Sequence, residues 1–243
     1  MKRFLILFLL FVCVSLSLSP LFIKSATIKD NQNANHMKPL SSDEVLFTAQ
    51  GTGETAYYYE TIEELTESSD YVVYGEVTDF TFNVKNTIIY TLENVRVIEP
   101  LFGNVNAGTQ ISVHKMGGYI LARDFIDSHD TYEERVGERN GRLFKNVSDE
   151  EINTKYIGQI PEGYFSPDIG ERSVFFLKKK KNSENTYGLT GGCEQGEFIE
   201  ITDGVLRYPG VENELSQFEN HTTVTYEELK EQILEAAGKL QEN

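Results

Sequence analysis

Acidic side chains and one histidine gather in the stretch RDFIDSHDTYEER, residues 123–135. Carboxylate oxygens are the preferred ligands of hard cations such as calcium, and a loop can fold several of them around one ion. The stretch lacks the glycine and the regular spacing of acids that an EF-hand needs. A solvated acidic loop is therefore the ordinary interpretation. The candidate metal ligands, with calcium as the candidate cofactor, are Asp124, Asp127, His129 and Asp130.

Cys193 lies in the glycine-rich stretch GLTGGCEQGEF and is followed by Glu194. A nucleophilic cysteine needs a nearby base and a lowered pKa, whereas an adjacent carboxylate acts in the opposite direction. His114 or His221 could approach the thiol in space, but nothing in the spacing indicates it. We expect a thiol in a turn between strands and no cysteine catalysis.

Two further groups of residues indicate binding or structural contacts and not catalysis. The lysine run 178–181 closes an apolar segment and is typical of a protected strand end, with contact to an anionic polymer as the alternative. The tyrosines at 57–59 either attach the preceding segment to the domain or stack on a sugar or a protein partner. No Ser-His-Asp order, phosphate-binding loop or dinucleotide fingerprint occurs. The sequence thus favours a binding protein over an enzyme.

The amino terminus has the layout of a secretory signal. Two basic residues precede an apolar run over residues 4–23, and small residues follow at Ser25 and Ala26. We predict a signal peptide over residues 1–26. The run is also about as long as a transmembrane helix, so an uncleaved membrane anchor is the alternative. Cleavage would leave Cys193 as the single cysteine, which excludes an intramolecular disulfide.

The net charge limits the choice of partner. It is −16 for the whole chain and −19 once residues 1–26, with three basic residues and no acidic one, are removed. Nucleic acid and anionic membranes are bound through clustered lysine and arginine, so both are expected to be repelled. We predict an extracellular or cell-surface protein of a Gram-positive bacterium, in contact with a membrane only through an uncleaved amino terminus.

Apolar periodicity predicts a mainly β domain. Residues 27–59 are polar and are expected to form a flexible stalk. TIEELTESSD predicts a short helix that leads into the strand YVVYGEVTDF, with Gly75 as a bend. TQISVHKMGG and four short segments after residue 170 predict further strands. A helix is expected over residues 225–240, because Thr225 and Glu228 form a capping box before an apolar stripe.

Two segments do not follow a simple pattern. In TIIYTLENVRVIEPLFG the apolar residues change parity, from Tyr90 and Leu92 to Val95 and Val97, which predicts a bulge near Glu93 and Asn94. Residues 119–169 are weakly patterned, and so long an insert is usually functional or disordered.

The order SSDYVVYGEV, VRVIEPLFGNVNAGTQISVHKMGG, IGERSVFFLKK and GCEQGEFIEI resembles that of small extracellular OB-like barrels. The netrin-type module shared with metalloproteinase inhibitors is a member of this group, as are exported proteins of Gram-positive bacteria. The resemblance covers residues 60–208 and implies a fold. The inhibitors chelate zinc through a disulfide-held amino-terminal cysteine, which this chain lacks. OB-like barrels commonly bind a ligand on one face.

The sequence therefore predicts an OB-like β-barrel over residues 60–243, with a short helix at its start, an insert at 119–169 and a carboxy-terminal amphipathic helix. Its expected role is non-enzymatic binding of a protein or a cell-wall polymer. The alternatives are a cation-dependent module or enzyme that uses residues 124–134, and a structural surface protein.

Overall fold

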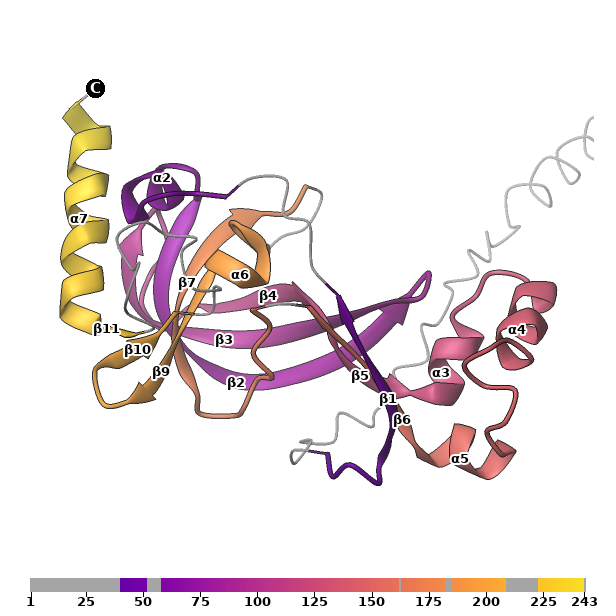
Figure 1. Cartoon of the computed structure of the whole chain (residues 1–243). Helices are drawn as coiled ribbons and strands as arrows, with labels where there is room; N and C mark the ends of the chain where they lie inside the picture. Colours follow the sequence, from indigo (N-terminus) through magenta and orange to yellow (C-terminus); the bar gives the residue numbers. More distant parts are fainter. Residues whose placement is uncertain (1–39, 52–57, 162, 182–184, 209–222, 243) are drawn as a thin grey trace, which may run out of the picture. The chain divides into compact units, whose positions relative to one another are not determined.

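The structure is a computed structural model of the chain, and it describes residues 40–51, 58–161, 163–181, 185–208 and 223–242 (Figure 1). The predicted signal peptide, Tyr57 and His221 lie outside the described residues. No helix in the described part is both long enough and apolar enough to span a membrane.

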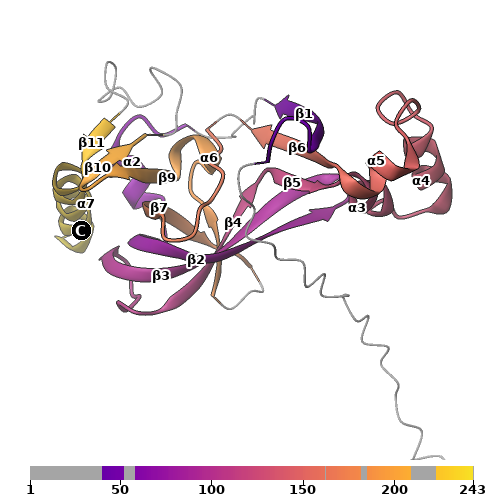
Figure 2. The same cartoon turned by 90° about the horizontal axis from the view of Figure 1, so that it is seen from below.

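The larger of two sheets is built around two long antiparallel strands, which lie side by side in both views (Figures 1 and 2). Its strand order among the described residues is β11-β10-β9-β7-β2-β3-β4-β8. The strands are β2 (Tyr71–Lys85), β3 (Ile88–Phe102), β4 (Gln110–Met116), β7 (Arg172–Lys179), β8 (Thr186–Leu189), β9 (Glu197–Thr202), β10 (Val205–Arg207) and β11 (Thr223–Thr225). Together with the smaller sheet they confirm the prediction of a mainly β protein.

The short strand β8 stands at one end of this order and also pairs with β7 in its interior. It pairs in parallel with β4 and antiparallel with β7, while β7 also pairs antiparallel with β2. All five strands β2, β3, β4, β7 and β8 contribute buried side chains to one cluster, called here the central core. Its buried members are Val73, Val77, Phe80, Val95, Val97, Ile111, Val113, Phe175, Leu177 and Tyr187.

A second core lies between the sheet and two helices, α2 (Ile62–Glu67) and α7 (Tyr226–Glu242), which contact each other. Both begin at caps that the sequence indicates. The Thr61 hydroxyl accepts the Glu64 N–H, and the Thr225 hydroxyl accepts the Glu228 N–H. Buried Leu229 and Ile233 of α7 then pack into this core.

The bulge predicted on β3 near Glu93 and Asn94 has its extra residue on β2. The β2–β3 register shifts at Gly75, as expected for a bend, and again at Thr78, which has no partner between Val77 and Asp79. No parity change occurs on β3, because Glu93 is buried on the same side as Val95. The predicted irregularity therefore occurs opposite Asn94 with its extra residue on β2, and the apparent parity change of β3 arises because the charged Glu93 occupies an inward position.

Residues 119–169, which the sequence left open between a functional and a disordered insert, form regular elements with their own core. The smaller sheet has the order β1-β6-β5. The elements of this region are β5 (Gly118–Leu121), α3 (Ala122–Asp127), α4 (Tyr132–Arg139), α5 (Asp149–Thr154) and β6 (Tyr156–Pro161). The three helices lie together beyond this sheet (Figure 1), around fully buried Phe144 and Ile152.

The expected flexible stalk also needs correction, since residues 45–51 form the strand β1 (Val45–Gly51). This strand pairs in parallel with β6. Leu46 and Phe47 pack against the core of the insert, and the Phe47 ring lies 5.6 Å from that of Phe144. The apolar pair has a partner only once the insert has folded, which is why the local sequence looks like a linker.

Gly75 tests the close packing of the central core. A Cβ at this position would overlap Val95 Cγ1 and approach Arg96 O to 3.3 Å. We expect Gly75→Ala to lower the free energy of unfolding by about 1–3 kcal/mol, measured by urea denaturation. Gly238 in α7 has open space around the same position, so Gly238→Ala should instead add about 0.5–1 kcal/mol. Equal effects of the two changes would contradict this description.

Candidate functional site

The inward faces of β3 and β4 place two opposite charges inside the protein. Thr91, Glu93 and Val95 alternate inward on β3, and Val113 and Lys115 do so on β4. Glu93 is opposite Val113 and Thr91 is opposite Lys115, so Glu93 and Lys115 are diagonal neighbours on one face.

A third charge comes from a distant part of the chain. Glu197 begins β9 directly after the short helix α6 (Gly192–Gln195) and pairs with Phe175 of the central core. Its Oε2 accepts a hydrogen bond of 2.8 Å from Lys115 Nζ, which also forms an ion pair with Glu93 Oε1. The three side chains, called here the buried charge cluster, are at most 4% exposed.

The segment after β6 covers the cluster. The Phe165 carbonyl accepts a hydrogen bond of 3.3 Å from Lys115 Nζ, and the Tyr164 ring lies 5.6 Å from the same nitrogen. The Tyr164 hydroxyl is 2.7 Å from Thr91 Oγ1. Lys115 of β4 is thus in contact with three other segments, which are β3, β9 and the loop 163–168.

Burial dominates the electrostatics. It raises the pKa of Glu93 more than Lys115 lowers it. Burial alone would lower the pKa of Lys115, but Glu197 and Glu93 hold it well above the usual value. Burial, followed by Glu197, raises the pKa of the nearby Glu171 to about 7. These surroundings therefore keep Lys115 charged and favour the protonated forms of Glu93 and Glu171.

Cys193 lies next to this cluster and not in a reactive environment. Its Sγ is 3.5 Å from the Met116 carbonyl. Burial raises the pKa of the thiol to about 12, so the thiol is protonated at neutral pH and is a poor nucleophile.

The four predicted metal ligands do not converge. Asp127 and Asp130 are exposed, and Asp124 is half-buried, with a pKa that burial raises. His129 Nδ1 is 3.0 Å from the Ile126 carbonyl, and its Nε2 is 3.9 Å from Glu138. Within the described ranges no group of three or more His, Cys, Asp or Glu side chains is arranged to hold a metal ion.

The other sequence candidates have structural partners. Tyr59 is attached to α6, because its N–H donates to Gln195 Oε1 and its carbonyl accepts from Gln195 Nε2. Lys178 and Lys179 lie where β7 pairs with β8, so this end of β7 is not a free edge. Tyr58 is 48% exposed.

The outward faces of β3 and β4 carry a row of rings and apolar groups. Tyr90 is opposite Met116, and Leu92 is opposite His114. The Tyr90 and His114 rings are 4.6 Å apart at an angle of 37°, and Met116 is 53% exposed. Farther along, Ser112 Oγ donates to Asn94 Oδ1. Burial and Lys180 lower the pKa of His114, which favours an uncharged ring stack. We call Tyr90, Leu92, His114 and Met116 the platform.

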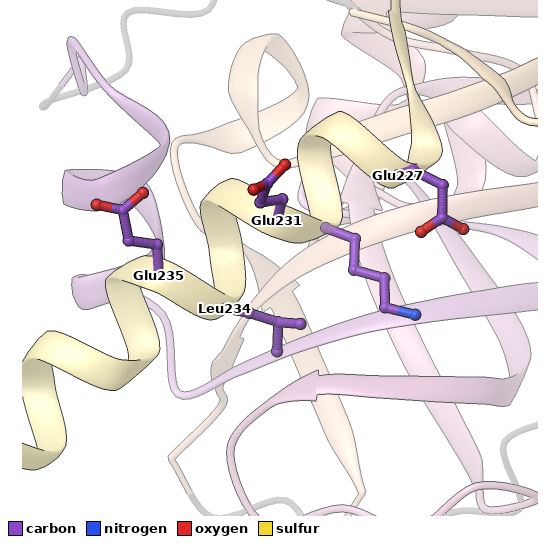
Figure 3. A pocket seen from close by; sticks show the side chains of 5 residues that line it. Glu227, Glu231, Leu234 and Glu235 are labelled. Atoms are coloured by element: carbon purple, nitrogen blue, oxygen red, sulfur yellow. The ribbon is translucent and has the colours of Figure 1, made fainter.

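A hollow also lies beside α7, lined by Glu227, Lys230, Glu231, Leu234 and Glu235. The labelled side chains project from this single helix (Figure 3). Lys230 is paired with Glu99 at 2.7 Å. The hollow brings no groups together from distant segments, so the platform and the buried charge cluster are the stronger candidates.

Comparison with known proteins adds no function to this geometry. A scan against models of protein families finds no match, and a search of curated proteins finds no similar sequence.

Sequence reasoning missed Glu93, Lys115, Glu171 and Glu197. A signal existed for two of them, since Lys115 is in phase with Ile111 and Val113, and Glu93 is in phase with Val95 and Val97. The contact of both with Glu197 depends on tertiary structure.

Removal of the lysine should be costly. Lys115→Met leaves two carboxyl groups buried without their cation, and we expect a loss of about 3–5 kcal/mol of unfolding free energy in urea denaturation. Lys178→Met, on the exposed part of β7, is the matched control and should change it by less than about 0.5 kcal/mol. A similarly small change of the unfolding free energy in both variants would show that the cluster does not stabilise the fold.

Glu171 should make stability depend on pH. Its pKa is about 7 in the folded protein and about 4.3 when unfolded, so its contribution is present below about pH 4 and is lost as the pH rises to about 7. As the pH rises from about 5 to about 8, the unfolding free energy of Glu171→Gln should fall by less than that of the wild type. The exposed Glu231→Gln should keep the wild-type slope; an unchanged slope in Glu171→Gln would contradict the assignment.

Proposed function

We propose that this chain is an exported, non-enzymatic binding domain built on an OB-like barrel, whose platform contacts a cell-wall glycan. The observation that carries the proposal is the stacked Tyr90–His114 pair beside the exposed Met116 on the outward faces of β3 and β4.

The order of strand pairings supports the barrel. β2, β3 and β4 form an antiparallel meander, β4 pairs in parallel with β8, and β7 pairs with both β8 and β2. This is the order expected of a five-stranded Greek-key barrel of the OB type, which binds oligosaccharides or oligonucleotides on the face of its second and third strands. In this chain those strands are β3 and β4.

Chemistry narrows the ligand class. The net charge of −16 opposes nucleic acid, which is bound through clusters of positive charge. The platform residues carry no charge where the two rings meet, and polar groups of Asn94 and Ser112 follow them on the same face. Such a surface suits a sugar ring, which presents an apolar face and hydroxyl edges. A wall glycan also fits the predicted secretory signal over residues 1–26.

The test uses purified peptidoglycan sacculi and co-sedimentation of the full chain. We expect the wild type to sediment with the sacculi and Tyr90→Ala to bind roughly ten-fold or more weakly, because it removes an aromatic anchor. Tyr132→Ala is the matched control, since Tyr132 on α4 is 71% exposed and lies outside the platform.

Urea denaturation of both variants checks that each is folded. Wild-type protein that stays in the supernatant, or equal binding by Tyr90→Ala and the wild type, would contradict the proposal. Among the described residues no arrangement favours the cation-dependent alternative over this one.

A further inference from the structure

The contact between Lys115 and Glu93 differs from an ordinary hydrogen-bonded ion pair. Lys115 Nζ touches Glu93 Oε1, yet neither carboxyl oxygen of Glu93 accepts a hydrogen bond from any described residue. The nitrogen therefore lies beside the carboxyl group, outside the directions that a hydrogen bond uses. Oε1 is bonded to Cδ, so the carboxyl carbon is one bond away from the atom that the nitrogen touches.

The surroundings fix the amine in this place. Lys115 Nζ donates to Glu197 Oε2 at 2.8 Å and to the Phe165 carbonyl at 3.3 Å, and the side chains of Lys115 and Glu93 are 1% and 0% exposed. A hydrogen-bonded nitrogen held against a carboxyl group has the proximity that makes an intramolecular reaction fast. Exclusion of water also protects an amide product from hydrolysis.

Burial of an unsatisfied carboxyl group provides the driving force. A buried carboxyl group, ionised or protonated, costs free energy when it has no hydrogen bonds, and neither oxygen of Glu93 accepts one. Condensation of the two groups removes both ionisable groups and replaces them with one neutral amide.

We propose that Lys115 Nζ and Glu93 Cδ are joined by an amide bond that crosslinks β3 and β4. In the reaction, Glu197 takes one proton from the Lys115 ammonium, and the free amine attacks Cδ of the protonated Glu93 carboxyl group. The N–C bond forms, a second proton passes from nitrogen to the departing hydroxyl, and the C–O bond breaks. One water leaves, the amide keeps the third proton, and Glu197 holds the first.

This assignment gives each member of the buried charge cluster a role. Lys115 is the nucleophile, Glu93 is the acyl group, and Glu197, in contact with the reacting nitrogen, is the proton acceptor. The reaction needs no oxidant, no cofactor and no second protein. It is independent of the platform and of the proposed binding function.

The test is the intact mass of the denatured full chain, compared with the mass calculated for the amino terminus found in the same sample. The expected result is a principal species lighter by one water molecule. Trypsin should then fail to cleave after Lys115 and should yield one product in which residues 86–96 are joined to residues 97–123 through a side-chain amide. Fragmentation of this product should place the bond between Glu93 and Lys115.

Lys115→Arg is the matched control, because it keeps the positive charge but cannot form this amide; its mass should be the full calculated value. Glu197→Gln should remove the proton acceptor and leave most of the chain at full mass. A wild-type chain of full mass would overturn the proposal. A mass lower by one water in a chain whose two peptides stay separate would also overturn it, because cyclisation of Asp203 at Asp203-Gly204 loses water without a crosslink. A bond from Lys115 to Glu197 would overturn it as well.

Discussion

The fold depends on a single buried lysine on β4. Lys115 brings β3, the strand after α6 and the segment 163–168 to one point, because each supplies an oxygen that its side-chain nitrogen contacts. An apolar residue in its place would pack without selecting among these segments, whereas a buried charge penalises every arrangement that leaves it unpaired. The cluster therefore contributes to the selection of one strand order, in which β9 follows α6 and starts beside β7.

The same alternation connects the inside of the sheet to its outside. On β3 and β4 the residues of one parity hold the central core and the buried charge cluster, and those of the other parity hold the platform. A shift of one residue in β3 would put Glu93 in solvent and Tyr90 in the core. The same shift in β4 would put Lys115 in solvent and Met116 in the core. The contact between Lys115 and Glu93 inside the sheet thus fixes which side chains are presented outside. A binding face on these strands is as well defined as the register beneath it.

Local patterns were sufficient where an element carries its own signals. The helix at the carboxy terminus begins at Thr225 with hydrogen bonds to Glu228, and strand alternation identified β4 together with its inward Ile111 and Val113. Local patterns failed where an element depends on a partner in another segment of the chain. Residues 45–51 form a strand only because β6 pairs with them, and the charged Glu93 broke the apolar pattern of β3. Neither the platform nor the charge cluster could be assembled without the β3–β4 register.

The insert shows why weak patterning is not the same as weak structure. Its helices α4 and α5 each begin with a capping box, at Thr131 with Glu134 and at Ser148 with Glu151, and the acidic stretch that suggested a metal loop includes the first of these caps. Carboxylates in a first helical turn also interact favourably with the helix dipole. Several acids of this region therefore stabilise helix ends, and their density on the surface follows from three short helices that share one small core.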